Sequence, residues 1–313
     1  MTGVTQRLII VILTWLSCFY LPAALAQAAS AATPAAAPVA PPRGALYQVS
    51  DGRHTLLLFG TIHVGAADFY PLEPGLTQAL AEAPVLALEL DPGNVGALQT
   101  AVRRHGLYPD GQRFQDQIDP TLAKRTLAAL QRYQMPLASI QAMRPWMLAM
   151  ALTVQAYEQH GYRSALAVDS YLADTVRRHG ARVVELESAE RQMGIFSRLD
   201  AAQQALFLKD SLDELDDDDL TRKLDRLVDA WRHADSAGFA TALKELQDDD
   251  SFSNRFTREA LLEQRNPGLA DGIASLLKGS DKAVAAVGIL HLVGPEGVPA
   301  QLARKGLKVR QLY

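Results

Sequence analysis

The feature that most constrains this chain is a repeat: an apolar segment followed by Gly-x-x-His occurs near both ends of its folded part. The first copy covers residues 54–63 and ends in Gly60-Thr61-Ile62-His63, and the second covers residues 283–291 and ends in Gly288-Ile289-Leu290-His291. Short apolar runs of this kind predict buried β-strands. A helix-forming segment and another apolar run follow each copy, so the sequence predicts two matched half-units of strand, Gly-x-x-His, helix and strand.

The other predicted elements lie around and between these half-units. Asp51-Gly52 predicts a hairpin turn that joins a strand at 46–50 to the first motif strand. Four aspartates at 216–219 are interpreted as a helix start rather than a calcium site, because no Asp-x-Asp-x-Asp-Gly loop is present. Further helices are expected at 76–83, 146–159, 170–178 and 299–305, and further strands at 85–90, 183–186 and 307–312.

These elements predict a single α/β domain over residues 44–313. The two half-units would pack together, as expected of an internal duplication, with a long helical insertion between them. The chain has 48% hydrophobic and 21% charged residues, which disfavours both a disordered chain and a protein with many membrane spans. Its formal net charge is -4 and it has no basic cluster, so nucleic acid is excluded as an expected partner.

The first 43 residues are not expected to belong to the domain. An apolar run at 8–21 and the small-x-small sequence Ala24-Leu25-Ala26 predict a secretory signal peptide over residues 1–26. The run is shorter than the roughly 20 residues of a membrane-spanning helix, so an uncleaved anchor is the less favoured alternative, as is a lipid on Cys18. Residues 27–43 are mostly Ala and Pro and predict an extended linker. We expect a periplasmic or secreted protein without a transmembrane span in its mature form.

Two of the seven histidines have an unusual context. His63 and His291 each lie three residues after a glycine at the carboxyl end of a predicted strand, where ligands bind in open α/β sheets. His105, His160 and His179 each precede a glycine and are interpreted as helix ends. A hydrogen-bonded core histidine is the alternative for His63 or His291 alone, but two equivalent histidines from two half-units are typical of a metal site.

Carboxylates at strand ends are the expected partners of these histidines. Glu89 and Glu187 each follow an apolar run, and a carboxylate in such a place costs desolvation free energy unless it is paired or binds a metal. Glu89 is predicted to be a ligand rather than a structural salt bridge, and for Glu187 both interpretations stay open. Asp169 precedes the helix predicted at 170–178, so we expect it to cap that helix rather than to bind a ligand.

A series of short motifs resembles the TraB/GumN family, whose members include the Tiki metalloproteases. In chain order these are Gly60 to His63, Glu89-Leu90-Asp91, Val168-Asp169, Leu186 to Gln192, Arg265-Asn266, Gly288 to His291 and Gly294 to Val298. The likeness covers nearly all of residues 44–313. It implies a Tiki-like α/β fold, a divalent metal ion near the two histidines and, in the animal relatives, hydrolysis of peptide bonds.

The leading hypothesis is therefore a metal-dependent hydrolase, and within that class a peptidase that acts on a peptide or protein. His63, Glu89 and His291 would hold a divalent ion (Mn, Co, Zn or Fe) with a position open for water. Glu187 would act as general base, and Arg265 would stabilise the oxyanion on the attacked carbonyl. The alternative for Arg265 is a structural ion pair with one of these acids.

Two other functions are kept open. A more distant resemblance, in fold and strand-end histidines only, is to erythromycin esterases and to ChaN-like haem-binding proteins. The protein would then be a haem- or metal-binding protein without catalysis, or a metal-free, esterase-like hydrolase in which His63 and Glu89 act as general bases.

Overall fold

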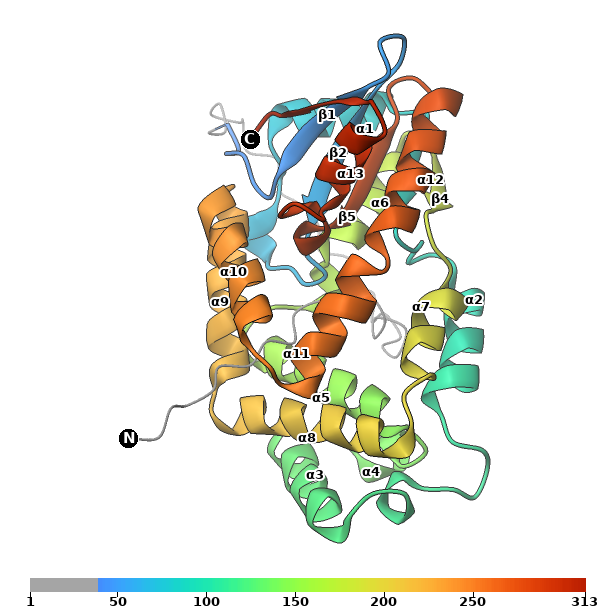
Figure 1. The fold of residues 1–313 in the computed structure, drawn as a ribbon, viewed down its shortest axis with the longest axis vertical. Coiled ribbons are helices and arrows are strands. Elements are labelled where there is room, and N and C mark those ends of the chain that lie inside the picture. The colour runs from blue at the N-terminus through green and yellow to red at the C-terminus, as the bar shows by residue number, and fades with distance from the viewer. Residues whose placement is uncertain (1–38) are drawn as a thin grey trace, which may run out of the picture.

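A computed structural model describes residues 39–313 as a mixed α/β fold (Figure 1). Residues 1–38, with the predicted signal peptide and most of the predicted linker, lie outside the described part. Six strands form one mixed sheet in the order β4-β3-β5-β2-β1-β6. Their bounds are β1 Leu46–Ser50, β2 Thr55–Thr61, β3 Val85–Leu88, β4 Arg182–Glu185, β5 Val284–Gly288 and β6 Lys308–Gln311.

The two motif strands lie side by side in the sheet. β5 pairs in parallel with both β2 and β3, and β3 pairs in parallel with β4. β1 is antiparallel to β2 and to β6. Strands of the two predicted half-units therefore alternate, because β5 of the second lies between β2 and β3 of the first.

The predicted hairpin is present, but its turn is longer than the two-residue turn expected from Asp51-Gly52. Ser50 pairs with Thr55, so the loop spans residues 51–54. The Asp51 carboxylate accepts hydrogen bonds from the backbone N–H groups of Arg53 and His54, and Gly52 has a positive φ of 93°. The aspartate thus closes the loop through its side chain, which a two-residue turn does not require.

The α-helices connect and surround the sheet. Their bounds are α1 Pro74–Glu82, α2 Val95–Ala101, α3 Pro120–Arg132, α4 Leu137–Ile140, α5 Pro145–Gln159, α6 Val168–Arg178, α7 Ala189–Phe196, α8 Ala201–Asp216, α9 Asp219–Arg232, α10 Ser236–Asp248, α11 Phe252–Phe256, α12 Asn266–Gly279 and α13 Val298–Arg304. Two π-helical turns, η4 Val102–Gly106 and η7 Thr257–Glu263, extend α2 and α11. No helix in residues 39–313 is long and apolar enough to span a membrane.

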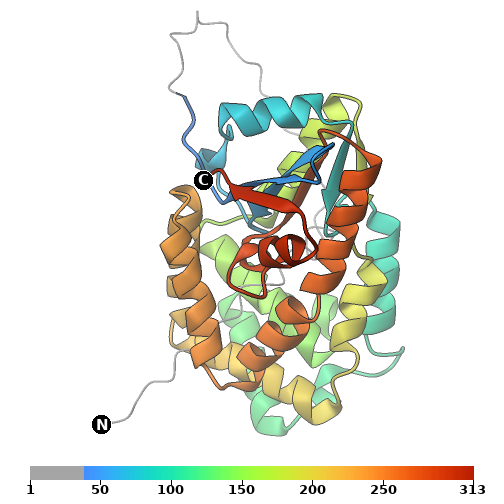
Figure 2. The ribbon, with the colours of Figure 1, turned by 45° about the horizontal axis from the view of Figure 1, so that its top comes forward.

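The helices fall into layers around the sheet. α1 and α6 cover one face of the sheet, and α12 and α13 cover the other (Figures 1 and 2). Helices α3, α4, α5 and α8 lie beyond the carboxyl ends of β2 and β5, and the α9–α10 hairpin flanks them. The space just beyond those strand ends is therefore enclosed by the helical insertion.

Trp231 fixes the α9–α10 hairpin to the sheet. Its indole N–H donates a 2.9 Å hydrogen bond to the carbonyl of Gly60 in β2. Its ring packs against Phe59 and Phe69, with ring centroids 6.4 and 4.9 Å away. This contact holds Leu227, one turn earlier in α9, over the first Gly-x-x-His motif.

The helix ends differ in part from those expected. His160 and His179 are the last capping residues of α5 and α6, and each is followed by a glycine with positive φ, as predicted. His105 lies in the last turn of η4, which ends at Gly106 as predicted, although that helix is a π-helix and this glycine has no positive φ; Nε2 of His105 is 2.9 Å from Glu190. The four aspartates span the end of α8 and the start of α9, in agreement with the predicted helix start.

Candidate active site

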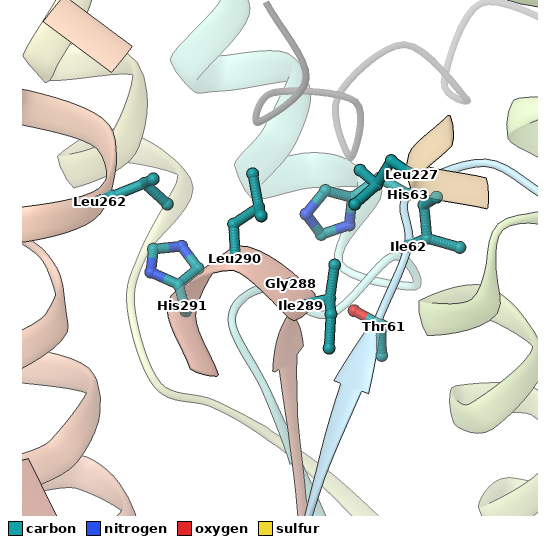
Figure 3. Close-up of a pocket in the computed structure, with 9 residues that line it drawn as sticks. All are labelled: Thr61, Ile62, His63, Leu227, Leu262, Gly288, Ile289, Leu290 and His291. Carbon is teal, nitrogen blue, oxygen red and sulfur yellow. The ribbon is translucent and has the colours of Figure 1, made fainter. Parts of the chain in front are cut away.

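The two Gly-x-x-His motifs meet because their strands are in register. Thr61 at the end of β2 lies opposite Gly288 at the end of β5, so the chain turns away from both strands at the same level. Figure 3 shows His63 and His291 on either side of the Gly288 to Leu290 turn. Both side chains are buried, with 7% and 2% of their surface exposed.

The two motif glycines have different steric roles. A Cβ at Gly288 would lie 3.1 Å from Nε2 of His63 and 3.3 Å from Oε1 of Glu89, so this glycine keeps the centre of the site open. A Cβ at Gly60 would lie 2.4 Å from the side chain of Ile289. Gly60 therefore allows the two motif turns to pack closely rather than leaving room for a ligand.

A small cavity separates the two histidines. Its volume is about 20 Å³, which is enough for one water molecule or ion. Apolar side chains from the turns that follow β2 and β5, from α9 and from η7 form most of its wall. It is lined by Thr61, Ile62, His63, Leu227, Leu262, Gly288, Ile289, Leu290 and His291 (Figure 3).

Glu89, directly after β3, is the acid that faces both histidines. Its Oε1 is 4.0 Å from Nε2 of His63 and 3.8 Å from Nε2 of His291. The same oxygen accepts a 2.7 Å hydrogen bond from the backbone N–H of Gly288. Burial acts to raise the pKa of Glu89, but Arg265, the two histidines and this N–H together hold the pKa well below its usual range. Glu89 is therefore a carboxylate in the folded protein.

Arg265 joins Glu89 to the second predicted acid, Glu187. Its Nη2 donates to Oε2 of Glu89 and, at 2.5 Å, to Oε2 of Glu187, and its Nε donates to the latter oxygen at 2.8 Å. Its Nη1 donates to the carbonyl of Leu261. Every guanidinium nitrogen thus has an acceptor within the protein, which is the geometry of the structural ion pair considered for this residue.

Glu187 keeps one oxygen without a hydrogen bond. Gln192 donates to its Oε2 at 2.7 Å, in addition to Arg265. Its Oε1 is buried and has no hydrogen-bond partner among residues 39–313. Nε of Arg191, whose side chain is half-exposed, is 3.9 Å from that oxygen.

Each motif histidine is anchored through its Nδ1. The Nδ1–H of His63 donates to Asp169 at 2.8 Å, and the Nδ1–H of His291 donates to Asn266 at 2.6 Å. The prediction that Asp169 caps the following helix was wrong. The helix begins one residue earlier, at Val168 after the cap position Ala167, and Asp169 lies in its first turn with its side chain directed to the site.

The surroundings shift the pKa values of the two histidines in opposite directions. Burial acts to lower the pKa of His63, but the charge and hydrogen bond of Asp169, with Glu89, raise it above its ordinary value. Burial lowers the pKa of His291 to about 3, because the attraction of Glu89 is opposed by Arg265 and His63. His291 is therefore neutral at physiological pH, and its buried Nε2 has no hydrogen-bond partner among residues 39–313.

The donor set fits a divalent ion. As placed, the described residues hold no group of three or more His, Cys, Asp and Glu close enough to chelate an ion directly. Ligand atoms about 2.1 Å from one tetrahedral ion are roughly 3.4 Å apart, and the two Nε2 atoms are 3.8 and 4.0 Å from Oε1 of Glu89. The two distances would have to shorten by about 0.4 and 0.6 Å to reach that spacing.

Five site residues were predicted from the sequence. The structure places all of them in one buried cluster: His63, Glu89, Glu187, Arg265 and His291. It adds three partners that sequence reasoning did not assign to the site, Asp169, Gln192 and Asn266. The available signal was their position within the quoted family motifs. Nothing local distinguishes them from polar residues that cap helices.

Comparisons with known proteins agree with the motifs. A sequence profile described as the TraB/PrgY/gumN family matches residues 45–311. The chain is similar to the uncharacterized protein YbaP of Escherichia coli strain K12, with 26% identity over 264 residues that cover 80% of this chain and 89% of that protein. It is equally similar to the YbaP protein of Shigella flexneri, with 26% identity over 263 residues, 80% of this chain and 88% of that protein. No solved structure gives a significant match.

Proposed function

The chain belongs to the TraB/PrgY/gumN family, and from this premise we propose that it is an exported, metal-dependent hydrolase that cleaves peptide bonds. The observation that carries the proposal is that Nε2 of His63 and Nε2 of His291 both lie within 4.0 Å of one oxygen of Glu89, and that the two histidines also line an ion-sized cavity. Two imidazoles and a carboxylate are a frequent ligand set of catalytic Zn²⁺ and also suit Mn²⁺, Co²⁺ and Fe²⁺.

The charges of the cluster support a divalent cation. Asp169, Glu89 and Glu187 are buried carboxylates, and Arg265 is the buried guanidinium that contacts two of them. With both histidines neutral, as metal ligands are, the buried cluster has more negative than positive charge. Because an uncompensated buried charge is costly, a bound dication would stabilise this arrangement.

The remaining residues supply the other functions that hydrolysis needs. His63, Glu89 and His291 would hold a divalent ion, which would supply the Lewis acidity that makes water nucleophilic near neutral pH. Glu187 is suited to accept the proton of the attacking water at Oε1, the oxygen without a hydrogen bond. Arg265 holds the two acids in place with its Nε and Nη2 donors, and the second hydrogen of Nη1 is the donor that these contacts do not use.

The proposed substrate class rests on the resemblance to the Tiki metalloproteases. The cavity of about 20 Å³ is far smaller than the 300–1,000 Å³ of typical ligand pockets. It gives no support to the alternative of a haem-binding protein. The metal-free alternative has one observation in its favour, the hydrogen bond between Asp169 and His63, which orients an imidazole as in general-base catalysis.

The proposal is tested by metal analysis and peptide cleavage with the purified mature protein. We expect about one equivalent of a divalent metal in the wild type and in His105→Ala, and loss of that metal in His63→Ala and in His291→Ala. Cleavage of a defined peptide mixture, followed by mass spectrometry, should stop after exhaustive chelation and return when the metal is restored. Full activity after chelation would favour the metal-free hydrolase, and bound metal without any cleavage would favour a metal-binding protein.

A further inference from the structure

The orientation of Asn266 fixes the proton on His291. The Nδ2 group of Asn266 donates a 2.8 Å hydrogen bond to the backbone carbonyl of Glu296, which can only accept. Its Oδ1 must therefore be the atom that faces Nδ1 of His291, at 2.6 Å. Since an amide oxygen only accepts, Nδ1 of His291 carries a proton, and Nε2 is the ring nitrogen that faces Glu89.

Asp169 fixes His63 in the same tautomer by a different route. Its Oδ2 accepts from Nδ1 of His63, and its Oδ1 accepts a 2.8 Å hydrogen bond from the hydroxyl of Thr61. Thr61 is itself part of the first Gly-x-x-His motif and is fully buried. The first motif thus carries a polar residue that orients the acceptor of its own histidine.

The second motif has the apolar Ile289 where the first has Thr61. Its acceptor, Asn266, is anchored by the backbone of the loop before α13 instead. Two unrelated sets of hydrogen bonds therefore give the two histidines the same orientation. In both cases a buried oxygen holds Nδ1–H, and Nε2 faces Oε1 of Glu89 at 3.8 to 4.0 Å.

We propose that Asp169 and Asn266 are positioning residues that hold the protonated Nδ1 of His63 and of His291, so that both Nε2 atoms point at the same place. Partners of this kind set the ring orientation and tautomer of metal-binding histidines, and their loss typically weakens metal affinity 10- to 100-fold. The part of this proposal that concerns metal affinity rests on the proposed function, whereas the tautomers are properties of the protein alone.

The tautomers are measured directly in the metal-free protein with ¹⁵N-labelled histidine by long-range ¹H–¹⁵N correlation. His63→Gln and His291→Gln assign the two signals by their disappearance. His179 is an internal reference, because its Nδ1 lies 2.9 Å from the carbonyl of Thr175 and must donate to it. We expect a protonated Nδ1 and an unprotonated Nε2 for His291, and a protonated Nδ1 for His63. An Nε2–H tautomer of neutral His291 in the wild type would overturn the proposal without any variant.

Substitution then separates positioning from general packing. Asn266→Leu removes the acceptor and should shift His291 toward the Nε2–H tautomer that imidazole prefers in water. Thr61→Val leaves Asp169 in place but removes the hydrogen bond from the Thr61 hydroxyl to its Oδ1. This change should disturb the NMR signal of His63 only. Its matched control is Thr126→Val, since Thr126 is equally buried and hydrogen-bonds within α3. Unchanged histidine signals in both Asn266→Leu and Thr61→Val would contradict the positioning role.

Titration with Mn²⁺, Co²⁺ and Zn²⁺ gives the second readout. We expect Asn266→Leu and Asp169→Leu to bind the metal 10- to 100-fold more weakly than the wild type or Thr126→Val. If the wild type has the predicted tautomers but binds none of these ions, the metal-dependent function is refuted and the positioning role stands. Wild-type affinity in both variants would refute the link between positioning and metal binding.

Discussion

Oε1 of Glu89 accepts a 2.7 Å hydrogen bond from the backbone N–H of Gly288. Gly288 of the second motif therefore hydrogen-bonds Glu89, which directly follows β3, the next strand after the first motif. This link depends on β5 lying between β2 and β3, and it ties the two half-units together at the point where the two histidines face each other.

Gly288→Ala should damage the site more than the fold. The added methyl group would lie 3.1 Å from Nε2 of His63 and 3.3 Å from Oε1 of Glu89, so it would occupy the position proposed for the ion. We expect loss of stoichiometric metal by elemental analysis, with thermal unfolding that remains cooperative. The control is Gly96→Ala in α2, where a Cβ meets nothing within 4 Å; it should keep the metal and stabilise the helix by roughly 0.5–1 kcal/mol. Metal retention in Gly288→Ala would place the ion elsewhere.

The two acids should fail in different ways. Glu89→Gln removes the carboxylate that faces both Nε2 atoms and should weaken metal retention. Glu187→Gln should keep the metal but slow peptide cleavage by roughly 10²- to 10⁴-fold, as expected for loss of a general base. The measurements are metal content after dialysis and turnover with metal in excess. The opposite pattern would exchange the two roles, and no change in either variant would make both acids structural.

Arg265 should be the residue of the cluster on which stability depends most. Arg265→Met would leave the buried carboxylates of Glu89 and Glu187 without their shared partner, which typically costs about 3–5 kcal/mol. The half-exposed Arg191 is a matched control, because its ion pair with Glu187 is long and exposed pairs contribute at most about 1 kcal/mol. Urea unfolding of Arg265→Met and Arg191→Met at pH 7 checks this difference. Equal free energies of unfolding would show that the ion pair makes no net contribution.

Glu214 should make the folded state less stable as the pH rises. Burial raises its pKa from 4.5 to about 8, although Lys223 lies 3.4 Å away and opposes that shift. The folded state therefore binds a proton that the unfolded state has released. This contribution is complete below pH 4.5 and disappears as the pH rises through about 8, with a slope of at most about 1.4 kcal/mol per pH unit.

Glu214→Gln cannot titrate and should remove that part of the pH dependence. Urea unfolding between pH 5 and pH 9 should give a flatter curve for the variant than for the wild type, and the two curves should differ most on the alkaline side. Parallel curves over the whole range would show that Glu214 ionises at its ordinary pKa in the folded protein.

The mature amino terminus should be Gln27. Ala24-Leu25-Ala26 is the best small-x-small sequence after the apolar run at 8–21. Intact mass and amino-terminal sequencing of protein from the periplasm or the culture medium measure the cleavage position. An intact Met1 on the folded protein would rule out removal of a signal peptide.

Local sequence patterns predicted all six strands of the sheet, with bounds that differ by a few residues, and the ends of several helices. β2 and β5 were visible as short apolar runs, and α5 and α6 end at histidine-glycine pairs as expected. Glu89 was found for a physical reason, because an acid directly after a buried strand needs a partner. These features depend on neighbours within a few residues.

The parts that were missed depend on contacts between distant residues. Asp169 and His63 are 106 positions apart, and a helix start with an acid in its first turn has the same local pattern whether that acid caps the helix or orients a histidine. Asn266 and Gln192 give no local sign of their roles either. The strand order could not be predicted from the sequence either, because no residue near β5 indicates that this strand lies between β2 and β3.

The place of β5 in the sheet also sets the order in which the sheet can assemble. β5 begins at Val284, and its partners β2 and β3 were completed about 200 residues earlier. In the sheet, β5 is the one strand that joins the antiparallel pair of β1 and β2 to the parallel pair of β3 and β4. Such long-range pairing is intrinsically slow. A chain that stops before Val284 would leave two separate strand pairs, instead of a sheet that merely lacks an edge.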